Sequence, residues 1–219
     1  MNKLVKKILV SGEIKLKTGL HIGGTNSSLN IGGPDKFVVR NPLSNEPYIP
    51  GSSLKGKLRA LLELAEGTIQ QNGKTWGPTQ DKTTKAGHLF GTADPKGDGQ
   101  QPSRLIVRDA PILSDIEEFV NTDLPYTEAK TEVNICRITA HANPRTFERV
   151  PAGARFKLDM VLNVFSEDNE EELINSLKKS LNLLEDDYLG GQGSRGYGQV
   201  EITDLQFTPK EMAEYEPKN

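Results

Sequence analysis

The sequence contains one cysteine, Cys136, among its 219 residues. A single cysteine excludes an internal disulfide and a zinc site built from a cysteine cluster, so we expect no zinc and a reducing cytoplasm. No apolar run approaches the ~18 residues that a membrane-spanning helix needs, and we expect no membrane partner. The basic and then apolar start is broken at Gly12 and Glu13, and no small-residue cleavage site follows. This start therefore favours a strand over a signal peptide.

An excess of positive charge is also lacking, because the net charge is −3. The distribution along the chain changes the meaning of this value. Residues 1–59 carry a net charge of +7, residues 60–158 carry −1, and residues 159–219 carry −9. A basic N-terminal third is able to line an anionic groove while the acidic C-terminal third stays in solvent. An uneven surface without a function remains the alternative.

Hydrophobic periodicity predicts an α+β core. We expect a first strand over 7–17 and a helix that is capped by Ser52 or Ser53 and stops at Gly67. The elements expected after it are a strand over 104–109, a hairpin over 127–150, a strand over 155–165, a helix over 170–188 and a strand over 198–207. Apart from the hairpin, this order is βαββαβ, the ferredoxin-like arrangement.

Three segments interrupt the regular pattern. Residues 18–50 are rich in glycine and proline and predict a long ordered loop, with a short strand at Phe37–Arg40. Residues 67–103 are polar and predict a partly flexible insertion. Residues 209–219 form a tail, so the predicted core comprises residues 1–66 and 104–208. Within the hairpin, the turn-prone centre is predicted at His141–Pro144.

The most specific motif is LGGQGSRGYGQV, residues 189–200, which has five glycines within nine residues. Such a loop exposes backbone N–H groups and is able to wrap a phosphate. Arg195 adds a bidentate phosphate donor and Tyr197 a stacking face. The RNA-binding candidates here are Gly191, Gly193, Ser194, Arg195, Gly196 and Tyr197. The pattern is neither a Walker nor a Rossmann motif, and a tight turn between helix and strand remains the alternative.

A second motif, IPGSSLKGKLR, marks the start of the first helix, where free amides and the helix dipole favour an anion. Lys55 and Arg59 share one face of this helix, and Lys57 projects elsewhere. We take all three as RNA-binding candidates that face outward. A solvated helix face would also explain these charges.

The loop that runs from GLHIGG to NIGGPD contains His21 and Asp35. An aspartate in a glycine–proline loop is usually structural, but it is also able to hold a divalent cation or to orient an attacking hydroxyl. Asp35 is therefore the candidate catalytic residue and the candidate metal ligand. His21 is either a general acid or base, or a contact at a strand end.

The predicted hairpin carries both signs of charge. Arg137, Arg145 and Arg149 are candidates for phosphate binding. Four carboxylates would form either a metal cluster or cross-strand salt bridges, and the salt bridges are favoured. These carboxylates are Asp109, Glu128, Glu132 and Glu148.

Taken in chain order, these motifs resemble the RAMP superfamily and, more closely, the backbone subunits of type III-A CRISPR (Csm) effector complexes. The resemblance runs through GLHIGG, NIGGPD, IPGSSLKGKLR, RLIVRDA, the hairpin from TEAKTE to RTFERV, and LGGQGSRGYGQV. It covers nearly the whole chain, apart from residues 67–103 and the tail after Phe207.

This resemblance implies a modified ferredoxin-like, or RNA-recognition-motif-like, core with a projecting β-hairpin thumb over about residues 127–149. Copies of the chain would stack along a guide (CRISPR) RNA with other subunits of the effector, and the thumb would kink the guide–target duplex. The expected activity is cleavage of complementary target RNA at regular intervals, dependent on a divalent cation, Mg²⁺ or Mn²⁺. The catalytic aspartate of the family falls on Asp35. Its guide contacts fall on His21, Lys55, Arg59 and Arg195.

Other functions remain open from the residues alone. The chain would be a non-catalytic RNA-binding scaffold if Asp35 has no chemical role. It would be a metal-independent RAMP endonuclease that processes guide RNA if His21 is the acid or base. A small-molecule phosphate enzyme is disfavoured, because a Walker lysine and an acidic ribose partner are lacking.

Overall fold

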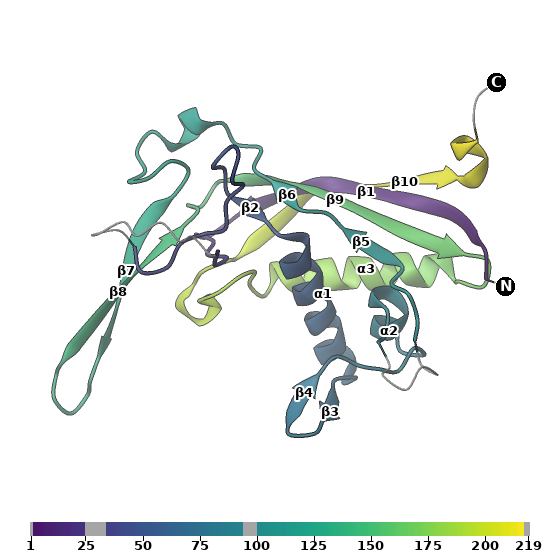
Figure 1. Ribbon diagram of the computed structural model, residues 1–219, viewed down its shortest axis with the longest axis horizontal. Helices are drawn as coiled ribbons and strands as arrows, with labels where there is room; N and C mark the ends of the chain where they lie inside the picture. The colour runs from purple at the N-terminus through teal and green to yellow at the C-terminus, as the bar shows by residue number, and fades with distance from the viewer. Residues whose placement is uncertain (1, 25–33, 94–99, 217–219) are drawn as a thin grey trace.

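The computed structural model describes residues 2–24, 34–93 and 100–216. Its centre is a four-stranded antiparallel sheet. The strand order is β10 (Val200–Glu211), β1 (Leu4–Leu16), β9 (Arg155–Phe165) and β5 (Leu105–Val107). Helices α1 (Gly51–Glu66) and α3 (Glu170–Glu185) cover one face of this sheet (Figure 1). The order β1, α1, β5, β9, α3, β10 confirms the ferredoxin-like arrangement.

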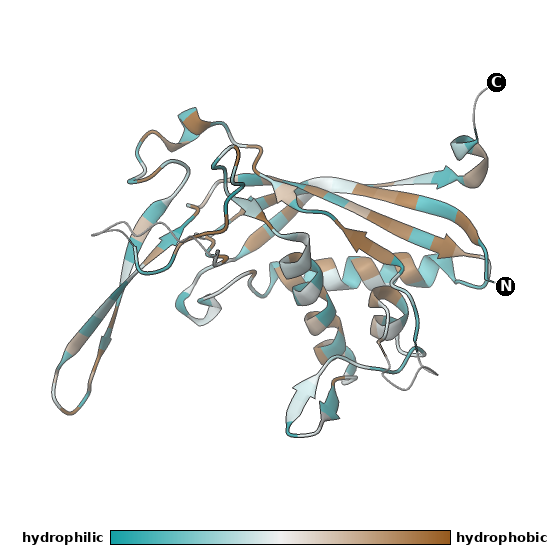
Figure 2. Cartoon of the chain, in the orientation of Figure 1, coloured by the Kyte–Doolittle hydropathy of each residue, from teal (hydrophilic) through white to brown (hydrophobic). Residues whose placement is uncertain are grey.

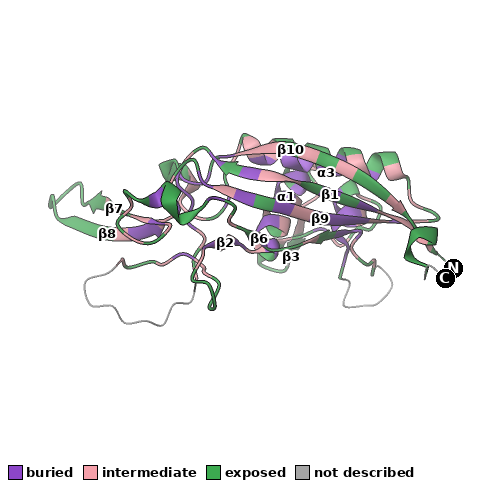
Figure 3. Ribbon diagram, turned by 90° about the horizontal axis from the view of Figure 1, so that it is seen from above, coloured by how far each residue is buried: buried purple, intermediate pink, exposed green. Residues whose placement is uncertain are grey.

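The core lies between the sheet and these helices (Figure 3). Alternation in β9 buries every second side chain, as predicted, and the leucine stripes of both helices meet it. Figure 2 shows the same pattern as brown strands in the central sheet, whereas the projecting hairpin is mostly hydrophilic. The residues that fill the core from β9 and the helices are Phe156, Leu158, Met160, Leu162, Val164, Leu54, Leu58, Leu61, Leu62, Leu173, Leu177, Leu181 and Leu184.

Helix α1 ends as predicted but starts differently. Gly67 adopts a left-handed conformation, with φ 65°, directly after the last turn. The N-cap is Pro50, not Ser52 or Ser53, because the helix begins at Gly51 and both serines lie inside it. The carboxylate of Asp109 accepts the N–H of Gly51 at 2.7 Å. A carboxylate from a distant segment therefore already occupies part of the helix N-terminus.

The predicted insertion over 67–103 needs a correction. Strands β3 (Gln70–Asn72) and β4 (Thr75–Gly77) do form a small hairpin beyond the end of α1 (Figure 1). Helix α2 (Lys85–Phe90), however, packs against α1 and α3. Its Leu89 is completely buried. The polar composition of the segment concealed this short amphipathic helix, and α2 belongs to the core.

Buried charges fix the end of the core near α2. The Asp168 carboxylate accepts hydrogen bonds from the Arg104 guanidinium at 2.7 and 3.0 Å and lies 3.0 Å from His88 Nε2. Burial raises the pKa of Asp168, but the donors from Arg104, the Phe165 amide and His88 outweigh it and leave that pKa below its usual value. This network ties α2 and β5 to the turn before α3.

The thumb hairpin consists of β7 (Glu128–Ile135) and β8 (Ala142–Arg149). Its turn spans residues 136–141 and is closed by a 2.9 Å hydrogen bond from the Cys136 amide to the His141 carbonyl. The predicted turn at His141–Pro144 is therefore wrong. Pro144 lies within β8 and pairs with Val133.

Short elements complete the described chain. Phe37–Arg40 is not a continuous strand, because Val38 and Arg40 form only isolated bridges, to Gly23 and Pro47. β10 continues to Glu211, beyond the predicted boundary of the tail. In the residues that the structure describes, no helix is long and apolar enough to cross a membrane. The remaining elements are β2 (Tyr48–Ile49), β6 (Ala110–Pro111), η1 (Ile116–Phe119), η2 (Gly193–Arg195) and η3 (Met212–Tyr215).

The place of α2 in the core is testable. Leu89→Ala should lower the free energy of unfolding by about 3 kcal/mol, because it leaves a cavity beneath α2. Trp76→Ala is the control, since Trp76 on β4 is 70% exposed and its loss should cost less than about 0.5 kcal/mol. Urea denaturation measures both values. Equal, small effects would place residues 85–90 outside the core.

Candidate nucleic-acid interface

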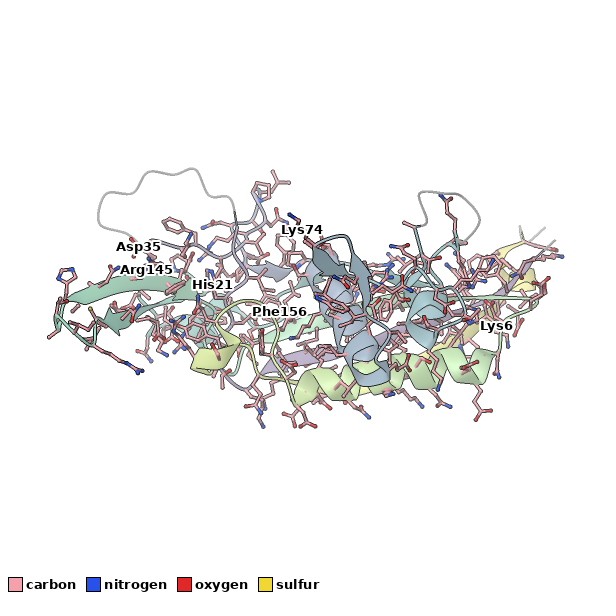
Figure 4. All side chains as sticks on the ribbon, turned by 90° about the horizontal axis from the view of Figure 1, so that it is seen from below. Lys6, His21, Asp35, Lys74, Arg145 and Phe156 are labelled. Atoms are coloured by element: carbon pink, nitrogen blue, oxygen red, sulfur yellow. The ribbon has the colours of Figure 1, made fainter. Side chains whose placement is uncertain are left out.

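Three segments that are far apart in the sequence meet where the thumb joins the core. The chain after β1 runs beside the end of β8, with Leu20 and Val150 exchanging hydrogen bonds of 2.8 and 2.9 Å. The glycine-rich loop joins them through the amide of Gly191, which donates to the His21 carbonyl at 2.8 Å. Figure 4 shows His21, Asp35 and Arg145 in this region, at the opposite end of the molecule from Lys6.

His21 is a connecting residue in this structure. Its side chain is buried, and its Nδ1 lies 2.7 Å from the Glu148 carbonyl oxygen. A carbonyl only accepts, so Nδ1 carries a proton. The ring also packs edge-on against Phe147, with centroids 5.6 Å apart. These contacts support the alternative of a strand-end contact and leave little of the ring open to a ligand.

Asp35 lies against the outer edge of β8. Its backbone N–H donates to the Thr146 carbonyl at 2.9 Å, and its Oδ2 accepts the Thr146 N–H at 2.8 Å. The next residue, Lys36, bridges to Phe147 in parallel, and its carbonyl accepts the Glu148 N–H at 2.9 Å. The segment that begins at Asp35 therefore adds to the hairpin like a third strand, and the Asp35 side chain is exposed.

A buried ion pair between Arg40 and Glu148 holds this added segment in place. The pair is 2.7 Å apart, and the two side chains are 8% and 2% exposed. The Glu148 carboxylate also accepts from the Val38 amide at 2.8 Å and the Thr127 hydroxyl at 2.7 Å. Arg40 further donates to the Pro125 carbonyl at 2.9 Å. One buried carboxylate thus joins the loop to the base of the hairpin, where β7 begins and β8 ends.

The glycine-rich loop uses its glycines for different purposes. Gly198, with φ 77°, lies so close to the Leu189 carbonyl that a side chain would collide with it. Gly196, with φ 79°, faces open space. Ser194, Arg195 and Gly196 form an exposed tip of the loop, whereas Gly191 and Gly193 are half-buried. The structure therefore shows both the tight turn and an exposed tip.

Tyr197 does not offer a stacking face. Its side chain is 1% exposed, and its hydroxyl donates to Glu132 at 3.0 Å. The charged ends of Lys130 and Arg149 lie 4.7 and 4.8 Å from its ring centroid. Burial, and then the hydrogen bond to Glu132, raise the pKa of Tyr197 to about 12. The predicted base-stacking role is therefore not supported, because Tyr197 instead anchors the glycine-rich loop to β7.

A hollow opens between this loop and the hairpin. It has a volume of about 140 Å³ and carries two exposed cations, Arg145 from β8 and Arg195 from the loop. The Arg195 guanidinium donates to the Gln192 side chain within its own loop. The full lining is Glu132, Val133, Asn134, Asn143, Arg145, Phe147, Gln192 and Arg195. Two predicted phosphate-binding arginines thus come together here.

Lys55, by contrast, is turned into the protein. Its ammonium donates to the Ser103 hydroxyl at 2.8 Å and to the Leu105 carbonyl at 2.7 Å. Burial, and then the charge of Arg59, lower the pKa of Lys55. The expectation that this residue faces outward is corrected, because its long side chain bends back to satisfy polar groups beside β5.

The two other basic residues of α1 also have internal partners. The Arg59 guanidinium donates to Glu63 at 2.7 Å and to the Thr79 carbonyl at 2.9 Å. The Lys57 ammonium lies 3.1 Å from Asp187. Their predicted RNA contacts would require these partners to be shared or exchanged.

The four carboxylates of the predicted cluster have separate tasks. Glu128 pairs with Arg149 across the hairpin at 2.7 Å, and Glu132 pairs with Lys130 at 2.8 Å. Asp109 and Glu148 serve the α1 N-terminus and the buried pair described above. In the described ranges, no group of three or more His, Cys, Asp or Glu side chains is arranged to hold a metal ion. Of these four carboxylates, Glu128 alone forms the cross-strand salt bridge that was favoured, because Lys130 lies on the same strand as Glu132 and Arg40 lies outside the hairpin.

The thumb exposes apolar side chains toward its turn. Val133, Ile135 and Ile138 are 53%, 57% and 94% exposed, and Arg137 lies beside them in the turn. This feature was not predicted, although Val133 and Ile135 are apolar residues at alternate positions of the projecting strand, and Ile138 follows in the turn. Arg40 and Thr146 were not predicted either, because neither has a local sequence signal.

A model of the RAMP superfamily matches residues 13–201. This chain belongs to the RAMP superfamily. Curated RAMP relatives carry the name "CRISPR system Cms endoribonuclease Csm3". The one from Methanocaldococcus jannaschii is 41% identical over 214 residues, which cover 96% of this chain and 84% of the relative. The one from Streptococcus thermophilus is 42% identical over 205 residues, covering 92% and 90%.

Solved structures support the same assignment. The Csm3–Csm4 subcomplex of the type III-A CRISPR-Cas interference complex contains a chain with a TM-score of 0.65 and 33% identity, covering 99% of this RAMP protein and 86% of that chain. Csm3 from Methanopyrus kandleri gives a TM-score of 0.64 and 26% identity, covering 97% and 79%. The resemblance found in the motifs and the predicted fold class are confirmed.

The importance of the buried pair in this RAMP protein is testable with two substitutions on one hairpin. Glu148→Gln should lower the free energy of unfolding by about 3 kcal/mol, because it leaves the Arg40 charge buried without an anion. Glu128→Gln breaks the more exposed pair with Arg149 and should cost less than about 1 kcal/mol. Chemical denaturation of both variants gives the comparison. Equal losses would mean that Glu148 is no more than another surface charge.

Proposed function

We propose that this chain is a guide-RNA-binding backbone subunit of a type III CRISPR effector that cleaves complementary target RNA at regular intervals. The observation that carries the proposal is the exposed Asp35 carboxylate, fixed to β8 one residue from Arg145, which lines the cationic hollow with Arg195. The relatives named endoribonuclease support the activity. The partners we propose are guide and target RNA, further copies of the chain and other effector subunits, in the cytoplasm.

Each part of the site has a task in this proposal. Arg145 and Arg195 bind RNA phosphates without reading bases, and the guide supplies sequence specificity by pairing. The apolar end of the thumb separates target nucleotides, which brings a 2′-hydroxyl into line with its neighbouring phosphate. Asp35 orients this hydroxyl for attack on the phosphorus. The 2′-oxygen forms a cyclic phosphate as the bond to the 5′-oxygen of the next nucleotide breaks, and the proton lost from the 2′-hydroxyl is balanced by one taken up by the leaving 5′-oxygen.

A divalent cation, Mg²⁺ or Mn²⁺, is part of the proposal. The described chain offers one exposed carboxylate at this place, with Oδ2 engaged by the Thr146 amide. This fits Mg²⁺, which is often held by one or two carboxylates together with substrate phosphates and water. When bound, such a cation would stabilise negative charge on the phosphate. Asp35 is the residue that would hold it.

Loss of the Asp35 carboxylate should abolish target cutting. Asp35→Ala removes it, and Asp35→Asn keeps the shape without the charge, so both should cut at least about 100-fold more slowly, and a chelator should stop the wild type. Assembly and target affinity should stay near normal, because the side chain is exposed. The assay is cleavage of complementary RNA by the reconstituted guide complex.

Two results would favour other functions. Cutting of target by Asp35→Ala at the wild-type rate would leave the non-catalytic scaffold as the better description. Cutting of a precursor guide RNA in chelator by the protein alone would favour the metal-independent processing endonuclease.

RNA affinity should depend more on the two arginines of the hollow than on the basic residues of α1. Arg145→Gln and Arg195→Gln should each weaken guide binding for all sequences and reduce the slope of log affinity against log salt by about 1. Lys210→Gln is the control, because it removes the same charge near the far end of β10 (Figure 1). Lys55→Met should instead reduce stability. Unchanged affinity and salt slope in both arginine variants would contradict the proposed interface.

A further inference from the structure

We propose that the backbone amide of Thr146, in β8, is a positioning group for the Asp35 carboxylate, which makes the thumb strand part of the cleavage site. This inference rests on the proposed catalytic role of Asp35. It adds a structural reason why that carboxylate has a defined position although it lies on an exposed loop.

The contact between the two residues is doubled. The Asp35 N–H donates to the Thr146 carbonyl at 2.9 Å, and the Thr146 N–H returns a hydrogen bond to Oδ2 at 2.8 Å. One backbone unit therefore fixes both the main chain and the side chain of Asp35. The next link along the strand, from the Glu148 N–H to the Lys36 carbonyl, keeps the two segments parallel.

This arrangement gives the two carboxylate oxygens different environments. Oδ2 is held by the amide, whereas Oδ1 has no hydrogen bond to any residue of the described chain. An exposed aspartate otherwise samples several rotamers, and loss of one fixed donor returns that freedom. Because a misplacement of about 1 Å is able to cost about 100-fold in rate, a fixed oxygen has a direct catalytic value.

The edge of β8 explains why the amide can be tested alone. Amides of alternate residues in an antiparallel strand point to the same edge. Thr146 and Glu148 point their N–H groups away from β7, toward the Asp35 segment. Pro144 lies two residues earlier on the same edge, so the hairpin already accepts a proline that lacks this donor. Thr146→Pro therefore removes the N–H without breaking the ladder to β7.

The side chain of Thr146 provides the matched control. Its hydroxyl lies 3.1 Å from the Thr131 hydroxyl on β7 and makes no bond to Asp35. Thr146→Ala removes this hydroxyl but keeps the amide. The comparison between proline and alanine at one position thus isolates the backbone donor.

The experiment is single-turnover cleavage of complementary RNA by the reconstituted complex. Thr146→Pro should cut about 10- to 100-fold more slowly than wild type, with target affinity and the spacing of the cuts unchanged. Thr146→Ala should stay within about twofold. If Thr146→Pro and Thr146→Ala cut at the same rate, whether both match the wild type or both are slower, the proposed role of the amide is overturned. Asp35→Ala is assayed in parallel, and wild-type cutting by that variant would refute the catalytic role itself.

A second measurement needs neither catalysis nor the proline variant. Hydrogen exchange of the Thr146 amide in the full-length protein should be at least about tenfold faster in Asp35→Ala than in wild type, because its acceptor is gone. Asp35→Asn should retain most of the protection, since a carboxamide oxygen still accepts. The Glu148 amide is the internal reference, because it donates to the Lys36 carbonyl. Identical Thr146 exchange in all three proteins would show that the contact does not hold the carboxylate.

Discussion

The buried carboxylate of Glu148 organises the whole junction between core and thumb. It neutralises Arg40, which is almost as deeply buried, and it accepts hydrogen bonds from Val38 and Thr127. The backbone carbonyl of Glu148 accepts a hydrogen bond from Nδ1 of His21. A charge removed from water in this way is costly unless each partner stays in place, so the loop, the hairpin base and β8 are constrained together.

The candidate site depends on this constraint. Asp35 gains a defined place by adding to the outer edge of β8. Arg145 comes from the same strand, and His21 brings the glycine-rich loop with Arg195 against it. The base of the thumb therefore forms one wall of the candidate site.

Among the predicted RNA-binding residues, burial rather than residue type decides which positive charges face solvent. Lys55 and Arg59 satisfy internal acceptors, whereas Arg145 and Arg195 have exposed guanidinium groups beside the hollow. An exposed guanidinium group is able to bind a phosphate in a bidentate way. Tyr197 is likewise engaged inside the protein, because its hydroxyl and ring anchor the loop.

The sequence by itself determined the order of the elements, the buried face of β9, the end of α1 at Gly67 and the family motifs, because periodicity and glycine preferences act within a few residues. Only the tertiary structure decided which polar residues are free. The hydrogen bond from the Gly51 amide to Asp109, the inward turn of Lys55 and the burial of Tyr197 arise from partners far along the chain. Sequence spacing does not encode these distances, since desolvation and hydrogen-bond geometry depend on the packed neighbours.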